Sequence, residues 1–413
     1  MVLLRSPLLW MALMSAIVTP ATARPADWDA SWAAPPAPPS LDAPGLPGSF
    51  LTPSFKNQTI VQVVRLSRGG TAIRLRLTNE YGAAALRIGA ARVVLVDEAG
   101  RPVERTRRVV TFAGRPDATI PSGAPWISDP MALAVPDRAR LQVSLYLPDD
   151  TGPCTCHATG AATARVSPAG DYTNRVFAPI DTFTARAFLS EVDVAADPAT
   201  GVVVTFGDSI TDGFQSSVDA DRRWPDQLVQ RLAAAPRRRM VGVANAGLSG
   251  NRILLDGNPA IFGQSAVERF DRDVLAIPGV GTVIVLLGIN DIGQKRPAPV
   301  TAAEIVAGYR QLIDRAHGRG LRIVGGTLLP YEGAAYYRPE GDAVRQEVNR
   351  WIRTSGAFDA VIDFDRAMRD PARPGRLQAH LQSGDWLHPN DAGYQVMANT
   401  AFASVATWSL RDR

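Results

Sequence analysis

From Gly201 onward, short apolar runs alternate with segments of helical periodicity, and this alternation constrains the fold more than any other feature of the sequence. Alternating strands and helices predict a parallel, doubly wound sheet with right-handed crossovers. Five such strands fit a flavodoxin-like order in an α/β domain, which we place at residues 198–413. The predicted strands are residues 202–206, 240–244, 282–287, 321–328 and 360–364. The predicted helices are residues 226–235, 265–275, 302–317, 342–354 and 391–406.

The region before Gly201 has a different pattern, and 413 residues are in any case too many for one ordinary core. Residues 73–77 alternate apolar side chains with arginine, as a half-buried strand does. Residues 61–66 form a similar run, and residues 68–70 between the two resemble a hairpin turn. Further strands are expected at residues 91–97, 108–112, 131–135 and 141–147. Short strands separated by turns predict an all-β sandwich or jelly-roll domain at residues 50–195.

The amino terminus has the pattern of a secretory signal peptide, which we place at residues 1–23. Arg5 supplies the positive charge, residues 8–18 the apolar segment and residues 21–23 a small-x-small cleavage site. The apolar segment is short for a bilayer span, so we favour a cleaved signal over an uncleaved anchor. The mature protein is then expected to be secreted or periplasmic, without a membrane anchor. The proline-rich residues 24–49 predict an extended segment that runs over a surface without regular structure.

The charge pattern argues against a nucleic-acid partner. The net charge is +4, and the basic residues, nearly all arginine, are spread along the chain. Nucleic-acid binding calls for a basic stripe with interleaved aromatic residues, whereas only residues 105–108 and 237–239 form short basic clusters. We therefore expect these charges to lie on solvated faces.

Cys154 and Cys156 are the only cysteines. Export allows a disulfide between them, although a ring this small is strained. A metal site would need more ligands than His157, the one that is close in sequence. The pair is predicted to be structural, and whether the two thiols are bonded stays open.

The stretch GVVVTFGDSITDG, residues 201–213, places a serine directly after the first strand of the α/β region. Gly207 ends the β-branched run, Asp208 and Ser209 follow, and the next helix signal begins only at Trp224. Open α/β sheets bind ligands at the carboxyl ends of their strands, which makes Ser209 a candidate nucleophile. The alternative is a turn in which Asp208 and Ser209 only hydrogen-bond to the backbone. The G-x-S-x-G nucleophile elbow is absent from the sequence.

Three further stretches are expected at the same edge of the sheet: residues 245–252, 288–291 and 385–389. A serine hydroxyl needs a general base, and His388 can serve as one. Asp385 lies three residues earlier, where a helical turn would bring the two side chains together. The carboxylate would then fix the imidazole tautomer and stabilise the imidazolium. The backbone N–H groups of Ser209 and Gly250 and the side-chain amide of Asn290 are suitable donors to a tetrahedral oxyanion.

These blocks resemble those of the SGNH (GDSL-type) hydrolase superfamily. GDSIT, NAGLSG, GIND and DWLHP occur in the order typical of the family. The resemblance implies the SGNH hydrolase fold, with Ser209 as nucleophile, His388 as base and Asp385 as the acid that orients it. It also implies that Gly250 and Asn290 complete the oxyanion hole with Ser209. Taken alone, each of Gly250, Asn290, Asp208 and Asp212 could simply form a turn.

We therefore predict a secreted serine ester hydrolase that works through an acyl-serine intermediate and needs no metal, nucleotide or organic cofactor. The expected partner is a small-molecule or polysaccharide ester, most plainly an acetyl group on a carbohydrate. Residues 50–195 resemble the accessory sandwich that precedes the catalytic domain in some secreted carbohydrate esterases of the superfamily. The alternatives are an arylesterase or lipase acting on short acyl chains, and a carbohydrate-binding protein with a relic hydrolase domain.

Overall fold

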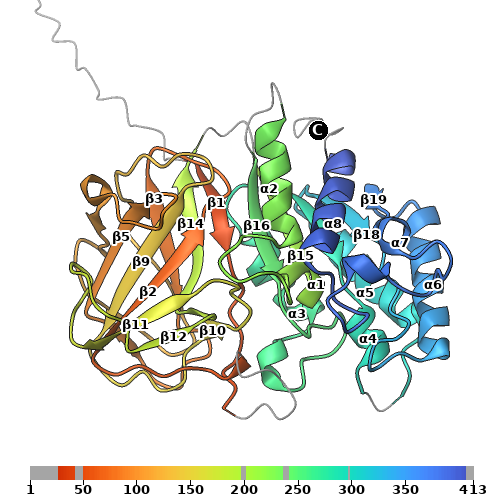
Figure 1. The fold of residues 1–413 in the computed structure, drawn as a ribbon, viewed down its shortest axis with the longest axis horizontal. Coiled ribbons are helices and arrows are strands. Elements are labelled where there is room, and N and C mark those ends of the chain that lie inside the picture. Colours follow the sequence, from red (N-terminus) through yellow and green to blue (C-terminus); the bar gives the residue numbers. More distant parts are fainter. Residues whose placement is uncertain (1–26, 42–49, 197–200, 236–240, 296–297, 406–413) are drawn as a thin grey trace, which may run out of the picture.

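The structure is a computed structural model, and it describes residues 27–41, 50–196, 201–235, 241–295 and 298–405. The predicted signal peptide, residues 1–23, lies outside these ranges. A β-rich half and a half of mixed strands and helices stand side by side (Figure 1). The two halves follow the predicted order along the chain, and the boundaries that we placed between domains stay predictions.

The second half is built on a parallel five-stranded sheet, and the predicted flavodoxin-like order is confirmed. Each strand pairs in parallel with its neighbours, and the first strand in sequence, β15, lies inside the sheet between β16 and β17. The order is β16 (Gly242–Gly247), β15 (Val202–Gly207), β17 (Val280–Leu286), β18 (Arg322–Gly326) and β19 (Ala360–Ile362). All side chains of β15 are buried, as the run of valines predicts for a strand covered on both faces.

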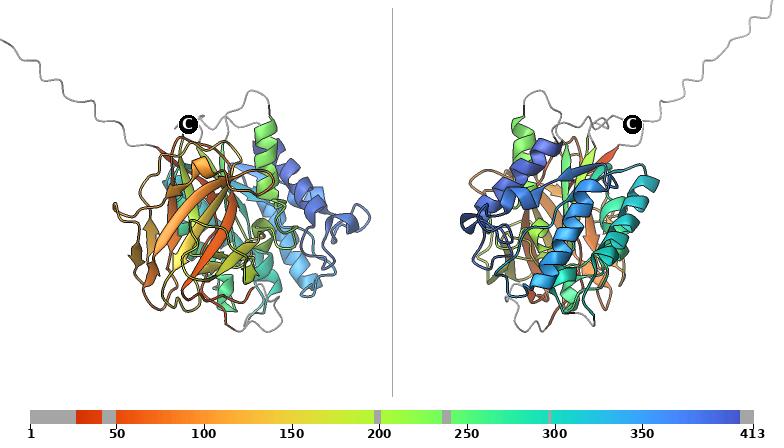
Figure 2. Two further views of the ribbon diagram at one scale, coloured as in Figure 1. Left: turned by 60° about the vertical axis from the view of Figure 1, so that its left-hand side comes forward. Right: turned by 90° about the vertical axis from the view of Figure 1, so that its right-hand side faces the viewer.

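Helices cover both faces of this sheet (Figure 2). One pair, α2 with α8, packs on one face, and α5 packs against α6 on the other. The helices are α1 (Ser209–Asp212), α2 (Trp224–Ala234), α3 (Ala266–Phe270), α4 (Ile289–Gly293), α5 (Ala302–Gly318), α6 (Pro339–Thr354), α7 (Phe364–Met368) and α8 (Asp391–Val405). Within the described ranges, none of the helices has the length and apolarity of a bilayer-spanning segment.

Three short helices, α1, α4 and α7, lie where we expected none, and α1 carries the candidate nucleophile. The sequence indicated no helix between Gly207 and Trp224, but α1 begins directly at Ser209. Its four residues are too few to show a helical period, and Gly213 ends it in a left-handed conformation with φ of 92°.

The first half contains two larger antiparallel sheets that share a core. The six-stranded sheet runs β12 (Asp181–Phe183), β11 (Ala164–Ala169), β2 (Gln58–Arg65), β9 (Arg140–Leu147), β5 (Ala90–Val96) and β6 (Arg108–Val109). The four-stranded sheet runs β1 (Trp28–Ala33), β14 (Leu189–Ala195), β3 (Ile73–Thr78) and β8 (Pro125–Ile127). Two short pairs accompany them: β4 (Leu86–Ile88) with β7 (Ala118–Ile120), and β10 (Cys156–His157) with β13 (Arg186–Ala187).

The expected hairpin at residues 68–70 is wrong, because β2 and β3 belong to different sheets. The glycines there serve close approach: a Cβ at Gly69 would collide with the carbonyl oxygen of Val135, and one at Gly70 with that of Ala195. The expected strand at residues 131–135 is reduced to two isolated bridges. Both errors arise because alternating apolar and polar side chains indicate a strand but not the strand with which it pairs.

The proline-rich segment also differs from expectation, because its residues Trp28–Ala33 form strand β1. This strand pairs with β14 and contacts β16, the edge strand of the parallel sheet. Ala30 belongs to the core of the parallel sheet, whereas Trp32 belongs to that of the β-rich half. Polar contacts tie the two halves further, since Ala30 N donates to Pro278 O at 3.0 Å and Val243 N donates to Ser67 Oγ at 2.9 Å.

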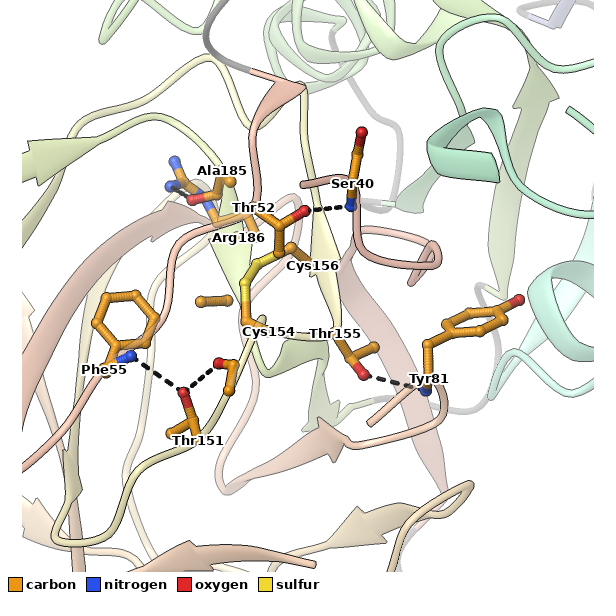
Figure 3. The surroundings of a disulfide bond; sticks show 12 residues. Ser40, Thr52, Phe55, Tyr81, Thr151, Cys154, Thr155, Cys156, Ala185 and Arg186 are labelled. Atoms are coloured by element: carbon orange, nitrogen blue, oxygen red, sulfur yellow. Dashed lines mark hydrogen bonds between the residues drawn. A yellow bond between two sulfur atoms is a disulfide. The ribbon is translucent and has the colours of Figure 1, made fainter. Parts of the chain in front are cut away.

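Cys154 and Cys156 form a disulfide in the β-rich half, and both are buried (Figure 3). Thr155 between them accepts a hydrogen bond from Tyr81 N at 3.0 Å. The Tyr81 hydroxyl in turn meets Gln264 Oε1 at 2.8 Å, in the other half of the molecule. The disulfide therefore lies beside the contact between the two halves, not at the distant end of the sandwich.

Candidate active site

Ser209 lies where β15 turns into a helix at the carboxyl edge of the parallel sheet. Asp208 caps this helix by accepting a hydrogen bond from Ile210 N at 3.0 Å, and Ser209 is its first residue. A side chain at Gly207 would collide with Thr211, so glycine is what lets the helix fold back over the end of the strand. Ser209 is 7% exposed and lines a cavity.

The side chains of Ser209, His388 and Asp385 form one hydrogen-bonded row. Ser209 Oγ lies 2.8 Å from His388 Nε2, and His388 Nδ1 lies 2.6 Å from Asp385 Oδ2. Because a carboxylate can only accept, Nδ1 carries the ring proton, and Nε2 is left to accept the Ser209 proton. The Phe214 ring meets the His388 ring edge-on, with centroids 4.8 Å apart, and restricts its rotation.

A loop, rather than the helical turn we expected, brings Asp385 to His388. The second carboxylate oxygen, Oδ1, accepts from Leu387 N at 2.9 Å and from His388 N at 2.8 Å, as in an Asx turn. Partial burial would raise the pKa of Asp385, but the hydrogen bonds from the His388 ring and from the two backbone N–H groups outweigh it. The pKa is held well below its usual range, so the carboxylate is charged whenever His388 needs an acceptor.

The three expected oxyanion donors meet at the same cavity. Ser209, Gly250, Asn290 and His388 all line it, and it encloses about 550 Å³. Ser209 is the first residue of its helix, so its N–H has no acceptor within that helix. Its N–H is therefore available to negative charge that develops beside the Ser209 hydroxyl, and Gly250 and Asn290 line the same cavity.

Neighbouring contacts fix the orientation of two of these donors. Asn290 Nδ2 donates to Asn251 O at 3.0 Å, and its Oδ1 accepts from the Tyr336 hydroxyl at 3.3 Å, so the NH₂ group points away from Tyr336. Gln294 Nε2 holds the Gly250 carbonyl at 2.9 Å. Gly250 has a φ of 76°, and a Cβ there would collide with the Phe262 ring. Glycine is thus required at this position for both its backbone angle and its lack of a side chain.

The rest of the cavity is mainly apolar and aromatic. The apolar and aromatic side chains that line it are Phe50, Phe214, Phe262, Tyr336 and Leu387, and the cationic ones are Arg252 and Lys295. The Phe50 ring packs against both Phe214 and Phe262, with centroids 6.0 and 6.1 Å apart. A cavity of this size and lining can bury a small organic group beside the Ser209 hydroxyl.

The carboxyl group of Asp208, the residue before Ser209, has a strongly raised pKa. Burial raises its pKa from 3.8 to about 7, against the lowering effect of the hydrogen bond from Ile210 N, and the nearby carboxylate of Asp291 raises it further. The folded protein therefore holds a proton on Asp208 in a pH range where the unfolded chain has released it.

We expect replacement of Asp208 by asparagine to remove a pH dependence of stability. Between pH 4 and 7 the native wild-type protein binds the extra proton, so its free energy of unfolding falls as pH rises, by about 4 kcal/mol at most. Asparagine keeps the cap acceptor but carries no charge. Denaturant unfolding at pH 5 and pH 8 measures the difference, with Asp181→Asn on an exposed strand as control. An unchanged pH dependence in Asp208→Asn would contradict this assignment.

The sequence pointed to the polar groups of the site but missed its aromatic wall. Phe262 ends a single 3₁₀ turn, Ala260–Phe262, and Phe50 directly follows the proline-rich residues, so neither belongs to a longer helix or strand whose period would single it out. Phe214 follows Ser209 by five residues, and proximity to the nucleophile was the one signal available. His157, named above only as the potential metal ligand next to the cysteines, contacts Asp212 in the segment that carries Ser209, as described below.

One protein-family model matches most of the carboxyl-terminal half. Residues 205–396 match the model of the GDSL-like Lipase/Acylhydrolase family. The match contains Ser209, Gly250, Asn290, Asp385 and His388. No curated protein is similar enough in sequence to match the chain.

Three similar solved structures each cover about half of the chain. An acetyl-xylooligosaccharide esterase variant from Geobacillus is 20% identical, with a TM-score of 0.39 over 52% of this chain and 97% of the other. A GDSL-like lipase from Bacteroides thetaiotaomicron is 19% identical, with a TM-score of 0.38 over 49% and 86%. The psychrotrophic esterase EstA from Pseudoalteromonas sp. is 16% identical, with a TM-score of 0.38 over 50% and 98%.

Proposed function

Because residues 205–396 match the model of the GDSL-like Lipase/Acylhydrolase family, we propose that this chain is a serine ester hydrolase that removes short acyl groups. One observation carries the proposal: the Ser209 hydroxyl, the His388 ring and the Asp385 carboxylate are hydrogen-bonded in series at 2.8 and 2.6 Å. The cavity that they reach also contains Gly250 and Asn290. A relic domain in a carbohydrate-binding protein would have no reason to keep this geometry.

The proposed reaction has two halves. In the first, Ser209 Oγ attacks the ester carbonyl while His388 Nε2 takes its proton, and Asp385 stabilises the imidazolium. The carbonyl oxygen becomes an oxyanion that accepts from the three donors. Collapse breaks the bond to the alcohol, which leaves with the proton from His388, and an acyl-serine remains. In the second part of the reaction, water gives a proton to His388 and attacks the acyl group. The acid is then released, and Ser209 regains its proton from His388.

For the substrate, we propose acetyl esters of carbohydrates. The predicted signal peptide supports an exported protein that meets polysaccharides outside the cytoplasm. The β-rich half precedes the α/β half in the sequence, as an accessory domain is expected to do. The aromatic wall favours a second candidate, a short-chain arylesterase, because flat apolar groups pack well against Phe50, Phe214 and Phe262.

Hydrolysis of a matched series of esters separates the two candidates. We expect acetate release from acetylated xylose oligomers. For nitrophenyl esters we expect kcat/KM to fall by about tenfold or more between acetyl and octanoyl, because even one methylene that does not fit the pocket costs about 1–3 kcal/mol. Phenyl acetate with little activity on acetylated sugars would favour the arylesterase. Preference for octanoyl esters would contradict the short-acyl proposal, and the absence of any ester hydrolysis would contradict the function itself.

A further inference from the structure

A buried polar network crosses from the β-rich half to the loop that carries Gly250. It begins at His157 on β10, which is 3% exposed. His157 Nδ1 lies 3.0 Å from the backbone oxygen of Pro35, and Nε2 lies 2.8 Å from Asp212 Oδ1. Both partners are hydrogen-bond acceptors, so the ring serves them as a donor.

Asp212 is also hydrogen-bonded to Ser249, the residue before Gly250. Its second oxygen, Oδ2, accepts from Ser249 N at 2.9 Å and from Ser249 Oγ at 2.7 Å. Ser249 Oγ also meets Thr159 Oγ1 at 2.9 Å, so a second residue of the β-rich half reaches the same point. Asp212 is 1% exposed and Ser249 4%, and such a network has few alternatives to these partners.

Asp212 joins the two backbone segments that supply oxyanion donors. It is the last residue of α1, which begins at Ser209, and it grips the backbone immediately before Gly250. The close approach is built in, because a Cβ at Gly247 would collide with the backbone of Asp212. A shift of Asp212 would thus displace the Gly250 N–H relative to the Ser209 N–H.

The segment that presents His157 is itself firmly held. Cys156, the neighbour of His157, is bonded to Cys154 (Figure 3) and accepts from Ala37 N at 3.0 Å. Buried Arg186, on the partner strand β13, donates to the carbonyl oxygens of Ala162 at 2.9 Å and of Gly160 at 3.4 Å. The loop from His157 to Ala162 is therefore pinned at both ends.

We propose that His157 is a positioning residue for the oxyanion hole and that the β-rich half completes the active site through it. The inference rests on the proposed function, since it assigns a role within that reaction. His157 touches no reacting atom: it holds Asp212 so that Ser249 and Gly250 stay in place. The β-rich half is then part of the catalytic unit, whether or not it also binds substrate.

Two substitutions of His157 in the full-length protein test the proposal. His157→Leu removes the donor ring, and we expect kcat for nitrophenyl acetate to fall by about 10- to 100-fold, as for a donor displaced but not lost, with KM within about threefold. His157→Gln can still donate to Asp212 and should recover most of kcat. Affinity for a short alkyl boronate, whose serine adduct is an anionic tetrahedron, should weaken in parallel with kcat.

A second variant covers the case in which His157→Leu does not fold. Thr159→Val is nearly isosteric and removes only the hydroxyl that meets Ser249. We expect about a fivefold loss in kcat, equivalent to one ordinary hydrogen bond, with a fall of no more than about 4 °C in melting temperature.

His317→Leu is the matched control. His317 also pairs with a carboxylate, Asp359, at 3.1 Å, but the pair is partly exposed at the opposite end of the parallel sheet. Its kcat should equal that of the wild type.

The outcomes separate the two claims. A wild-type kcat in His157→Leu would overturn the positioning role but not the proposed hydrolase function. If His157→Leu does not fold, an unchanged kcat in Thr159→Val would have the same meaning. Loss of kcat in His157→Leu without recovery in His157→Gln and without weaker boronate binding would also overturn it, because that pattern indicates general destabilisation. A wild-type protein that hydrolyses no ester would refute the proposed function first.

Discussion

Replacing Ser209 with alanine should lower kcat for nitrophenyl acetate by about 10⁴-fold or more while leaving the protein folded. The substitution removes the one atom that forms the acyl bond, and the His388 ring that it frees borders the cavity, where water can replace the lost contact. Steady-state ester hydrolysis measures the loss, and circular dichroism with thermal melting shows whether the fold is kept.

Ser217→Ala is the matched control for this experiment. Ser217 is exposed and lies eight residues further along the same segment, so the variant should have wild-type kcat. Hydrolysis at more than about one hundredth of the wild-type rate in folded Ser209→Ala would show that Ser209 is not the nucleophile. The donors of the oxyanion hole cannot sustain such a rate without a nucleophile.

Replacing Asp385 with asparagine should cost about 10⁴-fold in kcat, by reversing the tautomer of His388. The asparagine NH₂ can donate to Nδ1, which moves the ring proton to Nε2, where it faces the Ser209 hydroxyl and blocks proton transfer. Asparagine Oδ1 can still accept from Leu387 N and His388 N, so the loop should keep its shape. The measurement is kcat for the same ester, with melting temperature as the check on folding.

The second histidine–carboxylate pair again provides the comparison. Asp359→Asn alters the pair with His317, far from the cavity, and should leave kcat unchanged. An Asp385→Asn variant within about tenfold of the wild-type rate would mean that another group orients His388.

The α/β half could be predicted from sequence because its signals are local. The β-branched run at Val202–Val204 reads as a buried strand whatever its partners, and alternation with long helices admits few sheet topologies. In the β-rich half the same local signals located β2 and β3 but could not tell that these strands lie in different sheets. Pairing there depends on contacts across long sequence separations, as between β1 and β14, which no local pattern encodes.

The candidate site divides in the same way. Ser209, Gly250, Asn290 and His388 could be named because each follows a strand or precedes a helix in a distinctive short motif. The Asx turn at Asp385 could not be predicted, because the expected helical turn and the observed loop both place Asp385 three residues before His388. The contact from His157 to Asp212 joins residues 55 apart in the sequence and two halves of the molecule, so only the folded chain reveals it.

Covalent labelling tests the central claim most directly. A fluorophosphonate is attacked by an activated serine oxygen with loss of fluoride, and the phosphonyl group stays on that atom. We predict one adduct per chain, located by peptide mass spectrometry on the peptide that contains Ser209, formed at a rate that Asp385→Asn strongly lowers. An adduct on a different residue in a protein that hydrolyses esters, or no adduct at all, would contradict the account.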